Sequence, residues 1–342
     1  MDAELLQAGE RLVVHAGPRW VGDLLDEAAA GRWRPVSGPA TVEVSVERER
    51  HGFVTGDGEP VTRGAVRTGR AVVLRNACGS GFDLLVEPRG ADPVDPGPDV
   101  DVGADGSGVR VVARWRPPAR ERGAALALRS RFHLLVRAVL LQYPALWQAG
   151  RRGRVPLHAS GLALDGEVLL LAGPGGVGRT TTVLAAVERG AAACSDNLVV
   201  TDGRRLHGLV EPVRVEGGGG RRMAHARSER TLPGAVASLG PDRIVVLRRG
   251  TGAMRVAAID PDRAARVLTA ATYAAGELRR YWAFAATLAL GTGCGPAHPP
   301  VARVAAVLAA RLPAAELVLA GRPAGDPLAL LADLVATGGG TP

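Results

Sequence analysis

The sequence predicts an α/β fold with a β-rich N-terminal domain, and two observations carry this prediction. In the first ~115 residues, short runs that alternate apolar and polar residues are separated by turn signals. From residue 157 onward, strand patterns alternate with helix patterns, and a glycine-rich segment joins one such strand to a helix. We therefore expect a β-rich domain over residues 1–122 and an α/β domain over residues 123–342.

The N-terminal part contains four expected strands. Thr41–Val46 alternates apolar and polar residues, as a strand with one buried face does. Residues 71–74, 82–86 and 109–113 are rich in valine and leucine and are further expected strands. Between the last two, Pro88–Gly108 is dense in Pro, Asp and Gly and predicts a long loop.

A helix is predicted between the two domains, over residues 123–148. This segment is rich in Ala and Leu, and apolar residues recur along it at helical spacing, namely Leu128, Phe132, Leu135 and Val139. The densest basic cluster of the chain follows at residues 151–154, and we interpret it as a solvated turn before a strand.

Two strands are predicted next, at Leu157–Leu164 and Glu167–Ala172. Asp165-Gly166 separates them and is a strong signal for a two-residue hairpin turn. The second strand runs into the glycine-rich segment, and a helix is expected over Thr180–Arg189, with Gly190 at its end. Further expected elements are a strand at residues 243–247, helices that begin at Asp260-Pro261 and at Asp326-Pro327 (the second ending near Gly338), and a flexible loop at residues 217–220.

The glycine-rich segment, residues 173–180, fits the phosphate-loop pattern G-x-x-x-x-G-K-[ST], except that Arg179 stands in place of lysine. The glycines let successive N–H groups turn toward phosphate oxygens, and the following helix adds the positive end of its dipole. We expect Thr180 to offer its hydroxyl to Mg²⁺. The alternative is a glycine-rich connection that binds no ligand. The residues expected to bind ATP are Gly173, Gly175, Gly176, Val177, Gly178, Arg179, Thr180 and Thr181.

The composition excludes several classes of protein. All 42 basic residues are arginine and the net charge is +8, but no basic stretch alternates with aromatic residues, so we expect no nucleic-acid partner. No apolar run reaches the ~20 residues of a membrane span, and the N-terminus is acidic, so we expect a cytoplasmic protein without a membrane partner. Three distant cysteines fit neither a disulfide framework nor a zinc cluster.

Several local motifs resemble the core of HPr kinase/phosphorylase, and more closely the HPr-kinase-related P-loop serine kinases. His158 lies 15 residues before Gly173, and Asp196 lies 17 residues after Arg179; both intervals agree with that family. The resemblance covers residues 157–215 and implies a P-loop nucleotide-binding core of HPr-kinase type. Its motifs are His158-Ala159-Ser160-Gly161, the hairpin, the glycine-rich segment, Glu188-Arg189-Gly190 and Ser195-Asp196-Asn197.

The resemblance also implies roles for single residues. Asp196 takes the place of the general base, and His158 that of a group that orients or polarises its surroundings. Thr180, Asn197 and Glu211 take the place of Mg²⁺ ligands, and Arg179 that of the catalytic lysine. The implied reaction transfers phosphate from ATP to a hydroxyl, as of serine, on a peptide, protein or small molecule. The acceptor stays open, and so does the choice between a monomer and a homo-oligomer.

Two departures from the family keep a second function open. Arg179 replaces lysine, and Asn197 replaces an aspartate whose negative charge favours Mg²⁺. The alternative is therefore a degenerate nucleotide-binding regulatory module with weak or no phosphate transfer. A generic P-loop ATPase would need an apolar strand that ends in aspartate, whereas residues 243–248 end in arginine. Without the motif, Asp196 would be interpreted as a turn residue and His158 as a structural one.

Overall fold

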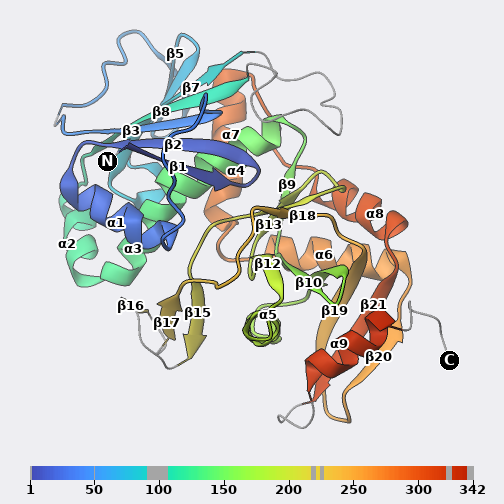
Figure 1. The fold of residues 1–342 in the computed structure, drawn as a ribbon. Coiled ribbons are helices and arrows are strands. Elements are labelled where there is room, and N and C mark those ends of the chain that lie inside the picture. Colours follow the sequence, from blue (N-terminus) through green and yellow to red (C-terminus); the bar gives the residue numbers. More distant parts are fainter. Residues whose placement is uncertain are drawn as a thin grey trace.

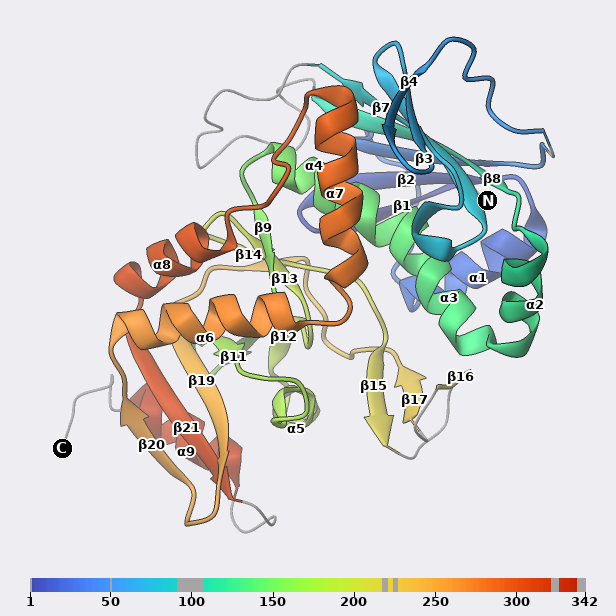
Figure 2. The same ribbon diagram turned by 180° about the vertical axis from the view of Figure 1, so that it is seen from behind.

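The computed structural model describes residues 2–49, 51–90, 107–216, 221–223, 227–320 and 326–336. These residues form a mixed α/β protein, as predicted, with sheets of eight, six, four and three strands (Figure 1). The largest sheet is built from the N-terminal part of the chain, and the six-stranded sheet with its helices lies at the other end of the molecule (Figure 2). Among the described residues, no helix combines the length and the apolar character needed to span a membrane.

The eight-stranded sheet confirms the strands predicted at residues 41–46, 71–74, 82–86 and 109–113. Its strands are β1 (Asp2–Gln7), β2 (Glu10–Ala16), β3 (Val42–Glu47), β4 (Glu59–Thr62), β5 (Ala65–Thr68), β6 (Ala71–Leu74), β7 (Phe82–Arg89) and β8 (Gly108–Trp115). They run in the order β1-β2-β3-β8-β7-β6-β5-β4, and β2, β3 and β8 are parallel to one another. Of the predicted loop, residues 91–106 lie outside the described residues.

The predicted bridging helix is found as a longer, interrupted helical segment. It consists of α2 (Ala119–Ala127), α3 (Arg129–Arg137), the π-helical turn η2 (Ala138–Gln142) and α4 (Tyr143–Arg151). In η2, the backbone hydrogen bonds span five residues instead of the four of an α-helix. This turn lies just before Pro144, which has no N–H to donate to the preceding turn. Every residue of α4 is buried, so this helix lies in the interior between the two halves of the molecule (Figure 2).

One hydrophobic core extends across the predicted domain boundary. Helix α4 packs on β2, β3 and β8, and α7 (Arg279–Thr292), from the C-terminal half, packs on β4 to β7. Helix α7 approaches the sheet so closely that a Cβ atom on Gly291 would lie 2.4 Å from Val72 Cγ2. Helix α1 (Arg19–Ala29) lies beside α3 and β2. The division at residue 122 stays a prediction, because this core draws on residues from both sides of it.

The prediction of a solvated turn at residues 151–154 is wrong for its first two arginines. Arg151 and Arg152 are each only 4% exposed. Arg151 Nη1 donates to the carbonyl of Gly108 at 2.7 Å, and Arg152 Nη1 lies 3.4 Å from the carboxylate of buried Glu10. These partners compensate the burial of charge, and they are too distant in sequence for a local pattern to indicate them.

The C-terminal half is a sheet covered by helices on both faces. Its elements are β10 (Ala159–Leu164), β11 (Glu167–Ala172), α5 (Arg179–Glu188), β12 (Ala192–Ser195), β19 (Arg243–Gly250), β20 (Arg255–Ala258), α6 (Pro261–Ala274), α8 (Val301–Arg311), β21 (Ala314–Ala320) and α9 (Pro327–Ala336). The strands run in the order β12-β10-β11-β19-β21-β20. Alternate residues of β11 and β19 pack against α6 and α8 on one face and against α5 and α9 on the other.

Several local predictions for this half are confirmed. Asp165 and Gly166 have φ values of +49° and +89°, as a type I′ hairpin turn requires, and β10 pairs with β11 across them. Asp260 caps α6, because its side chain accepts a hydrogen bond of 2.7 Å from the N–H of Arg263. Asp326 accepts from the N–H of Leu328 at 3.0 Å in the same way at the start of α9.

The strand predicted at residues 157–164 is divided in two at His158. The residues before it form β9 (Val155–Leu157) in a four-stranded sheet of order β18-β14-β13-β9, whereas those after it form β10. The other strands of that sheet are β13 (Val199–Thr201), β14 (Leu206–Gly208) and β18 (Ser238–Leu239). The remaining sheet consists of β15 (Val213–Glu216), β16 (Arg221–Arg222) and β17 (Arg227–Arg230). Both views place β15 and β17 between α5 and the pair α2–α3 (Figures 1 and 2). Residues 217–220, predicted as a loop, lie outside the described residues.

Candidate functional site

The glycine loop, residues 173–180, leads from the end of β11 into the first turn of α5. Gly173 and Gly176 have φ values of +146° and +77°, and a Cβ atom on Gly173 would lie 2.7 Å from the carbonyl oxygen of Leu247. In contrast, a Cβ atom on Gly175 or Gly176 would meet no atom within 4 Å. Neither of these two residues donates its N–H to a described backbone oxygen. The loop therefore presents open, hydrogen-bonding backbone at the N-terminal end of a helix.

The glycine loop faces a cavity of about 540 Å³, which we call the loop cavity. The predicted residues reach it from four chain segments: the junction of β9 and β10, the glycine loop, the residues after β12 and the segment before β15. Its other walls come from β15, β17, α6 and the residues after α6. The predicted residues that line it are His158, Gly175, Gly176, Arg179, Thr180, Asp196, Asn197 and Glu211. Gly173, Val177, Gly178 and Thr181 do not line it. Val177 packs into the core beside α5, and Thr181 is exposed.

Asp196 follows β12 and lies beside the first turn of α5. Thr180 Oγ1 donates a hydrogen bond of 2.9 Å to Asp196 Oδ2, and the Ser160 hydroxyl donates to the Asp196 carbonyl at 2.5 Å. Asp196 is only 5% exposed. Burial raises the pKa of this carboxyl to about 6, with a smaller contribution from the charge of Glu211. A carboxyl with this pKa is well suited to accept a proton near neutral pH.

The guanidinium group of Arg179 is held by His158. Nη1 donates to the His158 carbonyl and Nη2 donates to the ring Nε2, both at 2.5 Å. Burial and then the charge of Arg179 lower the pKa of His158 to about 4, so the ring is neutral and Nε2 can accept. Burial likewise lowers the pKa of Arg179 to about 10, which leaves the guanidinium charged at neutral pH. The observed partner of the His158 ring is therefore Arg179, and its predicted role beside Asp196 stays a prediction.

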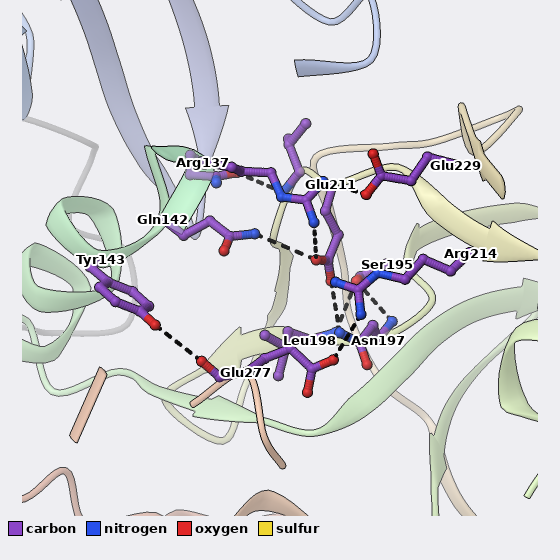
Figure 3. A network of polar contacts seen from close by, with 12 residues as sticks. Arg137, Gln142, Tyr143, Ser195, Asn197, Leu198, Glu211, Arg214, Glu229 and Glu277 are labelled. Carbon is purple, nitrogen blue, oxygen red and sulfur yellow. Dashed lines mark hydrogen bonds and ion pairs between the residues drawn. The ribbon is translucent and has the colours of Figure 1, made fainter. Parts of the chain in front are cut away.

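Asn197 and Glu211, two of the predicted metal ligands, contact each other. Asn197 Nδ2 donates to Glu211 Oε1 at 2.9 Å (Figure 3). The other oxygen of Glu211 accepts from Gln142 Nε2 at 3.5 Å and lies 3.7 Å from Arg137 Nη2. The Glu211 side chain is 4% exposed, so its negative charge is buried but surrounded by donors.

Three charged residues of the loop cavity were not predicted. Arg214 Nη1 donates to Glu277 Oε1 at 3.1 Å (Figure 3), and Arg227 of β17 also lines the cavity. They belong to β15, β17 and the segment after α6, and no local motif marks them. Together with Arg179, the two arginines Arg214 and Arg227 give the cavity three guanidinium groups, which lie beside the carboxyl groups of Asp196, Glu211 and Glu277.

The residues present fit a nucleotide with Mg²⁺. The open backbone at Gly175 and Gly176 and the three arginines suit phosphate oxygens. Among the described residues, no group of three or more His, Cys, Asp or Glu side chains is arranged to hold a metal by itself. Mg²⁺ does not need such a group at a nucleotide site, because one or two carboxylates, phosphates and waters usually bind it. Oxygen atoms that could bind Mg²⁺ are those of the Thr180 hydroxyl, the Asn197 amide and the Glu211 carboxylate.

Comparison with known proteins adds little to this description. No protein-family model matches the chain, and no curated protein sequence does. A solved structure of the Hpr(Ser) kinase/phosphatase from Coxiella burnetii matches with a TM-score of 0.28 and 11% sequence identity, over 54% of this chain and 89% of that chain. A structural relationship this weak carries no functional argument, so function has to be inferred from the residues and contacts of the loop cavity.

Proposed function

We propose that this chain is an ATP-dependent kinase of the HPr-kinase type, which transfers phosphate to a hydroxyl such as that of serine. The hydrogen bond between Thr180 and Asp196 is the observation that carries this proposal. It places a carboxyl with a pKa of about 6 directly beside the hydroxyl that ends the glycine loop. Phosphoryl transfer depends mainly on positioning, on charge neutralisation and on an oriented nucleophile, and the loop cavity has residues for each.

Six residues of the loop cavity have roles in the proposed reaction. ATP supplies the phosphoryl group, and Mg²⁺ neutralises its charge when bound. The N–H groups of Gly175 and Gly176 would bind phosphate oxygens, and the metal would be held by oxygen atoms of Thr180, Asn197 and Glu211. Asp196 accepts the proton of the acceptor hydroxyl while the oxygen of that hydroxyl bonds to phosphorus and the bond to the ADP oxygen breaks.

A second candidate is a regulatory nucleotide-binding module with weak or no phosphate transfer, and one contact favours it. The lysine of an ordinary phosphate loop reaches the β- and γ-phosphates as a point charge. Here the hydrogen bonds of Arg179 are made to His158. Arginine is bulkier than lysine and its charged group is planar. While the contact with His158 persists, the guanidinium of Arg179 is less able to move toward a phosphate group.

Binding and turnover of Mg·ATP by three proteins distinguish these functions. Calorimetry measures binding, and labelled ATP measures transfer or hydrolysis, for the wild type, Asp196→Ala and Arg179→Lys. The kinase proposal expects the wild type to bind and turn over ATP, and Asp196→Ala to bind without turnover. Binding without turnover by the wild type, with turnover restored in Arg179→Lys, would establish the regulatory module instead. If neither the wild type nor Arg179→Lys binds ATP, both proposals are wrong.

A further inference from the structure

A second and larger cavity lies on the far side of the three-stranded sheet from the glycine loop. Its volume is about 1110 Å³, and its walls come from α1, α2, α3 and β17. Trp20, Trp115 and Phe132 form its aromatic floor, with the ring centroids of Trp20 and Trp115 5.0 Å apart and those of Trp20 and Phe132 6.2 Å apart. We call this cavity the aromatic groove.

The aromatic groove exposes apolar surface that nothing in the described part of the chain covers. Trp20 is 38% exposed and Leu126 is 71% exposed, although both are large apolar residues. Helix α2, which carries Leu126, has no buried residue at all. A helix normally buries one face, and contiguous exposed apolar surface on a protein marks a site of interaction.

The rim of the aromatic groove is positively charged. Arg122, Arg129 and Arg230 line it and form no ion pair with any described residue. Of its acidic residues, Glu229 is paired with Arg137 at 3.2 Å, and Glu27 lies 3.5 Å from the ring of His133. Asp23 is the remaining acidic residue of the lining. The three unpaired arginines outnumber Asp23 and Glu27, and this excess favours an occupant with acidic side chains.

The aromatic groove and the loop cavity share a wall. Pro212 lines both of them, and β17 contributes Arg227 to the loop cavity and Arg230 to the groove. The buried side chain of Arg137 joins the two, because one nitrogen lies 3.7 Å from Glu211 and the other 3.2 Å from Glu229 (Figure 3). A chain bound in the groove could therefore extend past Pro212 toward Thr180 and Asp196.

We propose that the aromatic groove binds an acidic, apolar segment of the polypeptide that carries the acceptor hydroxyl. This inference rests on the proposed kinase function and specifies its substrate as a polypeptide. The groove is larger than the ~300–1,000 Å³ of sites for small ligands, and it is separate from the cavity where phosphate would be transferred. Aromatic residues with arginines around them are also the combination that anchors polypeptides at interfaces.

Peptide selection on the full-length protein tests this inference. A displayed random library of peptides of about 12 residues, which extend to about 40 Å, is selected on the wild type. The enriched peptides are synthesised, and their dissociation constants are measured by fluorescence polarisation for the wild type, Leu126→Glu and Arg129→Glu. Leu290→Glu is the matched control, because Leu290 is 67% exposed and Leu126 is 71% exposed, but Leu290 does not line the groove.

The expected result is that acidic peptides with apolar residues are enriched. Their binding should weaken at least tenfold in Leu126→Glu and Arg129→Glu, and should be unchanged in Leu290→Glu. Enriched peptides containing serine should then accept labelled phosphate, with a raised KM for the peptide in Leu126→Glu and an unchanged affinity for ATP. The inference is overturned if no peptide is enriched, if basic peptides are enriched, or if Leu126→Glu and Leu290→Glu bind alike. A wild type that binds these peptides but not ATP would instead refute the proposed function.

Discussion

Thr180 Oγ1 lies 2.9 Å from Asp196 Oδ2, which joins the first turn of α5 to the residue that follows β12. The contact orients the Asp196 carboxylate toward the end of the glycine loop, where the cavity opens. The contact uses the one proton of the Thr180 hydroxyl, and the lone pairs of that oxygen stay available to a metal ion.

Thr180→Val should weaken the binding of Mg·ATP. The substitution removes the hydroxyl and keeps the side-chain volume, so a loss of affinity reports on this oxygen. We expect the affinity for Mg·ATP to fall at least tenfold, or about 1.4 kcal/mol. Calorimetry with Mg·ATP measures it. Thr182→Val is the matched control, because the Thr182 hydroxyl is buried and donates to the carbonyl of Gly178 at 3.1 Å. Equal affinity in the two variants would contradict the role of Thr180.

Asp196→Asn should stabilise the protein in Mg²⁺-free buffer at about pH 8 while abolishing turnover. The folded pKa is raised from 3.8 to about 6, so the folded state binds a proton more tightly than the unfolded state does. That stability is fully present below the unfolded pKa and is lost as the pH rises through about 6. At 1.36 kcal/mol per pKa unit, the variant gains on the order of 3 kcal/mol at alkaline pH.

Urea unfolding of wild type and Asp196→Asn at several pH values measures this difference. The stabilisation should disappear below about pH 4, where the wild-type carboxyl is protonated in both states. A constant difference across the whole pH range would show that the effect comes from packing and not from the charge of Asp196.

Asn197→Asp should destabilise the protein at neutral pH, and Mg²⁺ should restore its stability. Asn197 Nδ2 donates to Glu211 Oε1 at 2.9 Å, and the substitution replaces this hydrogen bond by repulsion between a half-buried carboxylate and the buried carboxylate of Glu211. We expect a loss of about 2 kcal/mol, measured as a lower melting temperature, and recovery on addition of Mg²⁺. Asn197→Ala removes the same hydrogen bond without adding charge. Recovery of that variant by Mg²⁺ to the same extent would refute a metal site at this position.

Acid should destabilise the protein through His158 and His207. Burial is the main cause that lowers both pKa values to about 4, and Arg179 and Arg154 respectively add to it. Because the unfolded pKa is near 6.5, stability is present above that pH and is lost as the pH falls toward about 4. Asp196 acts in the opposite direction in part of this range, so the measurement is made in the Asp196→Asn background. There, adding His207→Gln should reduce the loss of stability between about pH 6.5 and 4, and an unchanged slope would contradict the prediction.

Local sequence patterns predicted those parts of the fold that local chemistry determines. The strand at Glu167–Ala172, the turn at Asp165-Gly166 and the cap at Asp260 are all confirmed. The hairpin of β1 and β2 was not predicted, because the first residue of its turn is Ala8, at a φ of +57°. Alanine rarely adopts this conformation, so the usual Asn-Gly or Asp-Gly signal is missing.

The candidate site was predictable only where one stretch of chain carries the pattern. The glycine loop and Asp196 lie within a motif of the resembled family, and the structure brings Thr180 and Asp196 into contact. Arg214, Arg227 and Glu277 reach the same cavity through tertiary packing of segments that have no motif of their own. The burial of Arg151 was mispredicted for the same reason, since its partners lie on distant strands.

The packing of α7 on the N-terminal sheet determines how late in synthesis the apolar face of that sheet can be fully covered. All eight strands of that sheet have been translated by Trp115, but the helix that covers β4 to β7 ends at Thr292. Helix α4 can cover β2, β3 and β8 early, but the apolar surface of β4 to β7 must stay uncovered on the nascent chain until the ribosome has made most of the protein. Long-range closure of this kind slows folding and exposes apolar surface to aggregation. We expect expression in a heterologous host to depend on chaperones that shield this face until translation reaches α7.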